Sequence, residues 1–136
     1  MWFTPVDKKR KKGDVIIMEI KLFNSELKIL NILWKDGDTP AKQIVKILNK
    51  ETGWNKSTTY TIIKRCIDKG IIENKGGDFI CHALISKEDA QKYETAELIN
   101  NMYDGSADRL VASLLDSGSL NKEEIDKLKE LINSIE

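Results

Sequence analysis

One segment of the chain combines residue types that suit contact with a nucleic acid. Between Asn55 and Gly70, apolar residues recur at helical spacing, and small hydroxyl and cationic side chains with one acid, Asp68, fill the opposite side. At about 100° per residue, the apolar set spans an arc of roughly 140° and the polar set roughly 120°. Short hydroxyl side chains let a helix lie deep in a groove, and cations bind phosphates and guanine edges. The outer face therefore predicts a helix that enters the major groove of DNA.

The residues expected to contact DNA lie on this outer face. They are Ser57, Thr58, Thr61, Lys64 and Arg65. An ordinary solvated surface helix also has one apolar and one polar side, so the segment taken alone leaves both interpretations open. The elements expected on either side of it favour DNA binding.

Two further helices are expected before this segment. The first follows the capping candidates Asn24 and Ser25 and ends at Gly37, where the helical repeat of apolar residues stops. The second begins at Thr39 and Pro40, because a threonine N-cap followed by a proline at the first helical position favours a helix start. Three helices joined by short turns predict a helix-turn-helix arrangement.

The chain changes from a helical to a strand pattern after Gly70. Asn55 is the expected N-cap of the third helix, and Gly70 is the expected left-handed residue at its end. Residues 71–75 and 78–84 then form two expected strands about Gly76 and Gly77. A hairpin directly after a helix-turn-helix is the wing of a winged helix.

The remaining fifty or so residues predict three short amphipathic helices, which are too little chain for a good core of their own. Gly105 and Gly118 separate the helices, and Asn121 with Glu124 predicts a capping box at the start of the last one. A second copy of the chain is the expected partner, and folding back onto the winged helix is the alternative. The expected dimer residues are Leu98, Ile99, Met102, Tyr103, Leu110, Leu114, Ile125, Leu128, Leu131 and Ile132.

The expected fold class is mostly α, with an N-terminal winged helix-turn-helix of three helices and a hairpin, followed by a C-terminal three-helix dimerisation region. Residues 1–17 are expected to be a disordered basic leader, 18–86 the DNA-binding domain and 87–136 the dimerisation domain. The net charge is +3 in each of the first two segments and −6 in the third. A basic part joined to an acidic part suits a DNA-contacting module followed by a segment kept off DNA.

Composition places the chain among intracellular proteins without a membrane span. Of its 136 residues, 40% are hydrophobic and 32% charged, and no apolar run approaches the ~20 residues needed to cross a bilayer. No signal peptide is apparent, because the apolar run at 15–18 is too short. Cys66 and Cys81 provide no disulfide framework. We therefore expect a cytoplasmic protein that does not insert into a membrane.

The residues offer no constellation for catalysis or metal binding. The chain has one histidine, no glycine-rich phosphate loop and no paired-carboxylate spacing. Cys81 and His82 are adjacent, so on a strand they point to opposite faces and make a poor metal pair. We expect no enzyme activity, no cofactor and no metal site.

The apolar and polar positions together resemble the family of penicillinase and methicillin-resistance repressors, which also includes copper-responsive repressors. The resemblance runs from about residue 20 to the C-terminus. It rests on Leu27-x-Ile29-Leu30-x-Ile32-Leu33-Trp34, on Ile44-Val45, on Trp54-Asn55-Lys56-Ser57-Thr58-x-x-Thr61-Ile62 and on Lys69-Gly70.

This resemblance implies a winged-helix dimer on a palindromic operator that blocks transcription of resistance genes. In the β-lactam branch, a membrane sensor-protease leads to cleavage of the repressor, which releases the operator. The family pattern adds Lys56, Tyr60 and Lys75 to the expected DNA contacts. Double-stranded operator DNA, a second copy of the chain and such a sensor are the implied partners.

Several positions depart from the family pattern. Asn55-Lys56-Ser57-Thr58 stands where the family usually has Ser-Pro-Lys-Thr, and Asp78 stands where a wing-tip arginine is common. The scissile Asn-Phe bond of antibiotic-responsive members corresponds to Ser113-Leu114 here, the candidate cleavage position. The cysteine-rich C-terminal motif of the copper branch is absent, which excludes copper sensing of that kind.

Two other functions are compatible with a winged helix. The domain could serve protein–protein contact alone, although such interfaces favour aromatic and aliphatic anchors over cations and hydroxyls. Alternatively, the DNA-binding protein could sense a different signal, either oxidation of Cys66 and Cys81 or a small ligand between the two domains.

Overall fold

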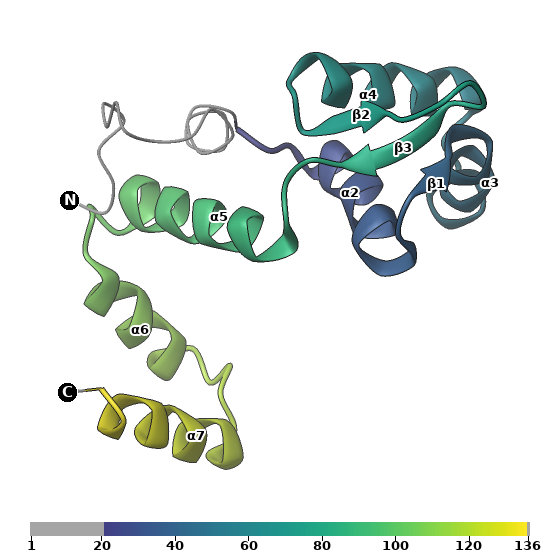
Figure 1. The fold of residues 1–136 in the computed structure, drawn as a ribbon. Helices are drawn as coiled ribbons and strands as arrows, with labels where there is room; N and C mark the ends of the chain where they lie inside the picture. Colours follow the sequence, from purple (N-terminus) through teal and green to yellow (C-terminus); the bar gives the residue numbers. More distant parts are fainter. Residues whose placement is uncertain (1–20, 136) are drawn as a thin grey trace. The chain divides into compact units, whose positions relative to one another are not determined.

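The computed structural model of the chain describes residues 21–135, which contain six α-helices and three β-strands (Figure 1). In chain order these are α2 (Asn24–Asp36), β1 (Thr39–Pro40), α3 (Ala41–Thr52), α4 (Lys56–Asp68), β2 (Ile72–Asn74), β3 (Ile80–Ala83), α5 (Lys87–Met102), α6 (Ala107–Asp116) and α7 (Lys122–Asn133). The predicted leader, 1–17, lies outside the described residues. Contacts group the described residues into two units, one ending at Glu94 and one starting at Thr95. None of the described helices is both long enough and apolar enough to span a membrane.

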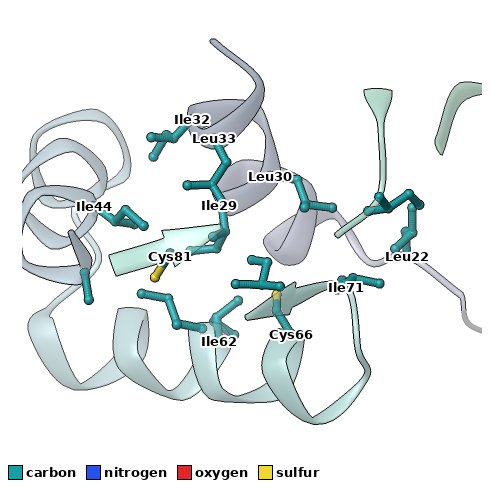
Figure 2. Close-up of a cluster of buried hydrophobic side chains, with 14 of the residues drawn as sticks. Leu22, Ile29, Leu30, Ile32, Leu33, Ile44, Ile62, Cys66, Ile71 and Cys81 are labelled. Atoms are coloured by element: carbon teal, nitrogen blue, oxygen red, sulfur yellow. The ribbon is translucent and has the colours of Figure 1, made fainter. Parts of the chain in front are cut away.

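The first unit is built around α4, which packs against α2 and α3. Figure 2 shows Ile62 and Cys66 of α4 directed toward Ile29 and Leu30 of α2, with Cys81 of β3 beside them. Burial of one such isoleucine or leucine stabilises the fold by about 1.5–3 kcal/mol. The largest of the almost fully buried side chains in the first unit are those of Ile29, Leu30, Ile44, Leu48, Ile63, Ile71, Ile72, Glu26, Thr59, Cys66 and Cys81. The predicted buried face of α4 is thereby confirmed.

The three strands form one antiparallel sheet in the order β1-β3-β2. β2 and β3 are the predicted hairpin, with Asn74 paired to Cys81 and the Lys75 N–H donating to the Ile80 carbonyl over 2.8 Å. The left-handed residue of the turn is Phe79, with φ 54°, and neither turn glycine has positive φ. A Cβ at either glycine would meet no atom within 4 Å, so crowding does not require glycine there, and the unusual backbone conformation lies at a bulky residue.

The predicted starts of the first two helices were wrong. Thr39 pairs with Cys81 as strand β1, and its hydroxyl donates to the Gly37 carbonyl over 2.8 Å. Its side chain therefore does not cap α3, whose N-cap is Pro40 and whose Ala41 N–H donates to the Phe79 carbonyl over 2.9 Å. A backbone acceptor from the wing replaces the side-chain cap that local sequence suggested.

The first described helix starts one residue earlier than its capping candidates suggest. Its N-cap is Phe23, and the Phe23 N–H donates to Oε1 of Glu26 over 2.9 Å. An acid at the third helical position thus satisfies one free backbone donor. Other predicted helix ends are confirmed: Asn55 Oδ1 accepts from Thr58 N–H over 2.7 Å, and Gly70 has φ 81°.

Two long-range bonds attach the segment before α5 to the first unit, and a local bond caps the start of α5. The indole Nε1–H of Trp34 donates to the Ile85 carbonyl over 2.9 Å, and the Leu84 N–H donates to the Ile71 carbonyl over 2.8 Å. Ser86 Oγ then accepts from the Asp89 N–H over 3.0 Å at the first turn of α5. Ala90 belongs to the same buried cluster as α2 and α4. The first turn of α5 is therefore part of the winged-helix core.

The second unit contains the second half of α5 and two whole helices, α6 and α7, in which no residue is buried. Gly105 and Gly118 have the left-handed conformation predicted at the breaks, with φ of 80° and 72°. The predicted capping box is present, because Asn121 Oδ1 accepts from the Glu124 N–H and Glu124 Oε1 accepts from the Asn121 N–H. The large exposed apolar residues of this unit are Leu98, Met102, Val111, Leu114, Leu115, Leu131, Ile132 and Ile135.

Replacing the indole of Trp34 should loosen the attachment of α5. We expect Trp34→Phe to lower the free energy of unfolding by about 1–3 kcal/mol, because it removes a long-range hydrogen bond and some packing. Trp54→Phe is the matched control, since Trp54 is also partly buried but its indole nitrogen bonds no residue within 21–135. Urea unfolding of the full chain measures both. Equal losses from the two variants would show that the bond to Ile85 contributes nothing.

Candidate nucleic-acid interface

The outer face of α4 is open to solvent as predicted. Ser57, Thr58, Thr61 and Lys64 are all exposed, whereas Thr59 on the opposite side is fully buried. Asn55 caps the helix through its side chain, so the first turn is fixed without a bulky residue at its outer end. The outer face carries short side chains over the first two turns of α4, which suits close approach to base edges in a major groove.

Thr61 occupies the centre of this outer face. Its hydroxyl donates to the Ser57 carbonyl within the same helix over 2.9 Å. A hydroxyl has one donor and two acceptor lone pairs, so this bond leaves Thr61 Oγ1 as an acceptor toward the outside. The exocyclic amino groups of adenine and cytosine are the matching donors in the major groove.

Arg65 lies at the edge of the outer face and bonds to α2. Its Nε–H donates to Oε2 of Glu26 over 2.9 Å, and its Nη2 donates to Oγ of Ser25 over 2.7 Å. The guanidinium therefore links α4 to the first turn of α2, an arrangement that the sequence did not predict. Part of the side chain, 43%, stays exposed, which leaves Nη groups accessible to a further partner.

Glu26 is the buried acceptor of this arrangement, with none of its side chain exposed. Lys69 Nζ lies 2.8 Å from the Glu26 carboxylate and is its second cationic partner. Burial alone would raise the Glu26 pKa, but hydrogen bonds from Lys69, the Phe23 N–H and Arg65 together lower it below its ordinary value. Glu26 is therefore ionised at neutral pH and holds both cations at the end of α4.

The other edge of α4 contacts the wing through Tyr60. The ring centroids of Tyr60 and Phe79 lie 5.8 Å apart with the planes tilted by 56°. Lys75, Gly76, Gly77 and Asp78 at the wing tip are exposed, and Lys75 is the cation predicted to bind phosphate there. Tyr60 thus supports the wing as well as belonging to the set predicted to touch DNA.

Sequence reasoning missed the contribution of Glu26 and Ser25 to this interface. An acid at the third position of a helix is a local signal for capping, but its pairing with α4 joins residues 39 apart in the chain. Lys56 is exposed at the start of α4, and Lys64 extends from the same face. Of the predicted DNA-contacting residues, Tyr60 packs on the wing and Arg65 bonds to α2. The others are exposed on α4 or at the wing tip: Lys56, Ser57, Thr58, Thr61, Lys64 and Lys75.

Cys66 and Cys81 are buried, and His82 is paired with an acid. Burial raises the pKa of Cys66 to about 12 and that of Cys81 to about 11, so both are neutral thiols rather than reactive thiolates. His82 Nδ1 lies 2.6 Å from Oδ1 of Asp38, which joins β3 to the turn before β1. Among residues 21–135 no group of three His, Cys, Asp or Glu side chains could hold a metal ion.

Comparison with known proteins matches this chain over nearly its whole described length. A family model described as "Penicillinase repressor" matches residues 22–134. The penicillinase repressor of Bacillus licheniformis is 25% identical over 114 residues, covering 82% of this chain and 89% of that protein. The methicillin resistance regulatory protein MecI of Staphylococcus aureus strain N315 is 28% identical over 116 residues, covering 83% and 94%. The penicillinase repressor of Staphylococcus aureus is 29% identical over 119 residues, covering 86% and 94%.

A solved structure also matches part of the chain. It is the solution structure of the monomeric form of Bacillus licheniformis BlaI in complex with the blaP half-operator. The match has 25% sequence identity and a TM-score of 0.46, and it covers 52% of this chain and 88% of that one.

Neutralising Glu26 should destabilise the first unit in a pH-dependent way. Because its pKa is lowered from about 4.5 by folding, the ionised carboxylate stabilises the fold above about pH 4.5, and this contribution is lost as the pH falls through the lower folded value. We expect Glu26→Gln to lower the free energy of unfolding at pH 7 by about 1–3 kcal/mol.

The difference between Glu26→Gln and the unmodified chain should then shrink as the pH is lowered through that window. Urea unfolding at a series of pH values measures this difference in the free energy of unfolding. Glu51→Gln, at an exposed position, is the control. A difference that stays constant down to the lowest pH would contradict the assigned ionisation of Glu26.

Proposed function

The chain belongs to the penicillinase repressor family, and we propose on this premise that it is a transcriptional repressor that binds operator DNA through α4 and the wing. The observation that carries the proposal is the outer face of α4, where four polar side chains are exposed to solvent: Ser57, Thr58, Thr61 and Lys64. Small hydroxyls admit the helix into the groove, and Lys64 supplies positive charge for phosphate or guanine. Lys75 at the wing tip adds a second cation on the same unit.

We infer that the repressor is a homodimer that places one α4 in each half of a palindromic operator. The exposed apolar residues of the second unit support this, since Met102, Leu131 and Ile132 are each more than half exposed in a single chain. Ile99 differs from the other predicted dimer residues because it is already buried within the chain. Half-site centres should then lie about one helical turn, 10 bp, or a multiple of that apart.

The regulated genes in this proposal are those of a β-lactam-resistance operon, in keeping with the names of the relatives. Release of the operator would follow proteolysis at Ser113-Leu114, triggered by a membrane sensor-protease. This bond lies inside α6, and Ser113 Oγ accepts from the Tyr103 hydroxyl over 3.2 Å. A protease acts on locally opened chain, so α6 must unfold around Ser113 before it can be cut.

Other signals receive less support from the residues present. Oxidation sensing through Cys66 and Cys81 requires accessible thiolates, whereas both thiols are fully buried and have raised pKa values. A role in protein–protein contact alone would leave the hydroxyl and cationic face of α4 without a purpose, because interface centres favour aromatic and aliphatic anchors.

Removing the charge of Lys64 should weaken DNA binding. We expect Lys64→Gln to lower affinity for a duplex from the region upstream of the chain's own gene and to reduce the slope of log affinity against log salt by about one. Lys35→Gln, which removes the same charge from exposed α2 surface, should leave both unchanged. Fluorescence anisotropy with the full chain measures this. If the unmodified chain binds neither the operator nor a scrambled duplex at low salt, DNA binding is excluded.

Placing a charge on α7 should separate the dimer. Leu131 is 62% exposed, and Leu131→Glu puts a carboxylate into the proposed interface, where burying an unpaired charge is costly. We expect sedimentation equilibrium to show a monomer. Its far-UV and near-UV circular dichroism spectra should show that the first unit is still folded. Lys129→Gln changes the charge equally on the other side of α7 and should stay dimeric. A dimer that survives Leu131→Glu would place the interface elsewhere.

A further inference from the structure

A cluster of cations surrounds one exposed aromatic ring beside the outer face of α4. The Phe23 cluster consists of Lys21, Phe23, Arg65 and Lys69, drawn from the start of α2 and the end of α4. Lys21 Nζ, Arg65 Cζ and Lys69 Nζ lie 5.6, 5.7 and 4.5 Å from the centroid of the Phe23 ring. The ring is nevertheless 46% exposed, so these cations leave much of its apolar surface in contact with water.

Within residues 21–135, the cluster holds more positive charge than the one carboxylate bonded to it can balance. Glu26 pairs with Arg65 and Lys69, and its side chain is completely buried behind them. Three cations against one carboxylate leave two positive charges in excess, and Lys21 has no bond from its Nζ to any residue that the structure describes. Like charges gathered on one surface repel each other, and an anion bound there relieves the repulsion.

Resting on the proposed function, we propose that the Phe23 cluster binds a phosphate of the DNA backbone at the edge of the groove that α4 enters. Arg65 belongs both to the cluster and to the rim of the outer face, so DNA seated on that face brings its backbone to the cluster. Lys21 and the N–H donors of Arg65 that Glu26 and Ser25 leave unbonded bind the phosphate oxygens, and the flat ring of Phe23 covers the adjoining deoxyribose. Glu26 and Ser25 are positioning residues that fix the guanidinium.

The bonds within the cluster prepare Arg65 for this contact. Nε and Nη2 are already held by Glu26 and Ser25 over 2.9 and 2.7 Å, so the long side chain loses less freedom when it binds a phosphate. Arginine presents five N–H donors, and two bonds leave donors for a phosphate. An arginine held in this way contributes affinity independent of base sequence, because phosphates are common to all sites.

Lys21→Gln tests the cluster directly in the full chain. Lys21 is exposed and lies before α2, so the fold should be unaffected. We expect weaker binding by about threefold to tenfold, equally on operator and scrambled duplexes, and a salt slope reduced by about one. Lys28→Gln, an equal charge change about 200° around α2 from Glu26, is the matched control and should bind like the unmodified chain. Ethylation interference should locate one phosphate whose modification weakens binding of the unmodified chain but not of Lys21→Gln.

The outcomes separate this inference from the proposed function. If the unmodified chain binds its operator and Lys21→Gln matches Lys28→Gln in affinity and slope, the Phe23 cluster is not a phosphate site, while α4 keeps its DNA contact. If Lys21→Gln weakens operator binding alone, Lys21 contacts bases and the phosphate assignment is wrong. If the unmodified chain binds no duplex, both inferences are wrong.

A second pair of variants tests the positioning of Arg65. Ser25→Ala removes the hydroxyl bonded to Nη2 without changing any charge. We expect affinity for both duplexes to fall by about twofold to fivefold with the salt slope unchanged, and Ser25→Thr, which keeps the hydroxyl, to restore it. Equal binding by Ser25→Ala and the unmodified chain would exclude a positioning role for Ser25.

Discussion

A buried carboxylate and its two cations hold the recognition helix to the rest of the first unit. Glu26 is fully buried in α2, and a charge in that position is tolerable only if it is paired and hydrogen-bonded. Arg65 in the last turn of α4 and Lys69 directly after it meet this requirement, and the Phe23 N–H completes it. The requirement fixes the rotation of α4, because only one rotation brings both cations to the carboxylate while Thr61 faces outward.

The opposite edge of α4 is supported by a neutral contact. Tyr60 packs on the ring of Phe79, while the Phe79 carbonyl accepts the first N–H of α3. One residue of the wing therefore joins the sheet, α3 and α4, and its left-handed backbone is tolerated because these contacts over-determine it. Between the Arg65 contacts on one edge and the Tyr60 contact on the other, the outer face of α4 packs against no other element of the first unit. Its side chains can be small and polar at no cost to the fold.

Local sequence patterns predicted the features that depend on neighbouring residues, namely the helices and several of their ends. The helical repeats, the left-handed residue at Gly70 and the cap at Asn55 follow from short-range sterics and hydrogen bonding, and each is present. The start of α3 was mispredicted because its N–H acceptor is Phe79, far along the chain. The partner of Arg65 was missed for the same reason, since nothing near Arg65 in sequence marks Glu26. The outer face of α4 could be predicted because it follows from helix periodicity alone.

The bonds at Ile85 and the burial of Ala90 bear on how such a chain can be recombined during evolution or by design. A gene fusion made at the end of β3 would discard the first turn of α5 and expose the core beneath Ala90. A junction placed after Glu94 would keep that turn with the winged helix. A residue inserted between Ala83 and Ile85 would pull the Ile85 carbonyl away from the indole that holds it.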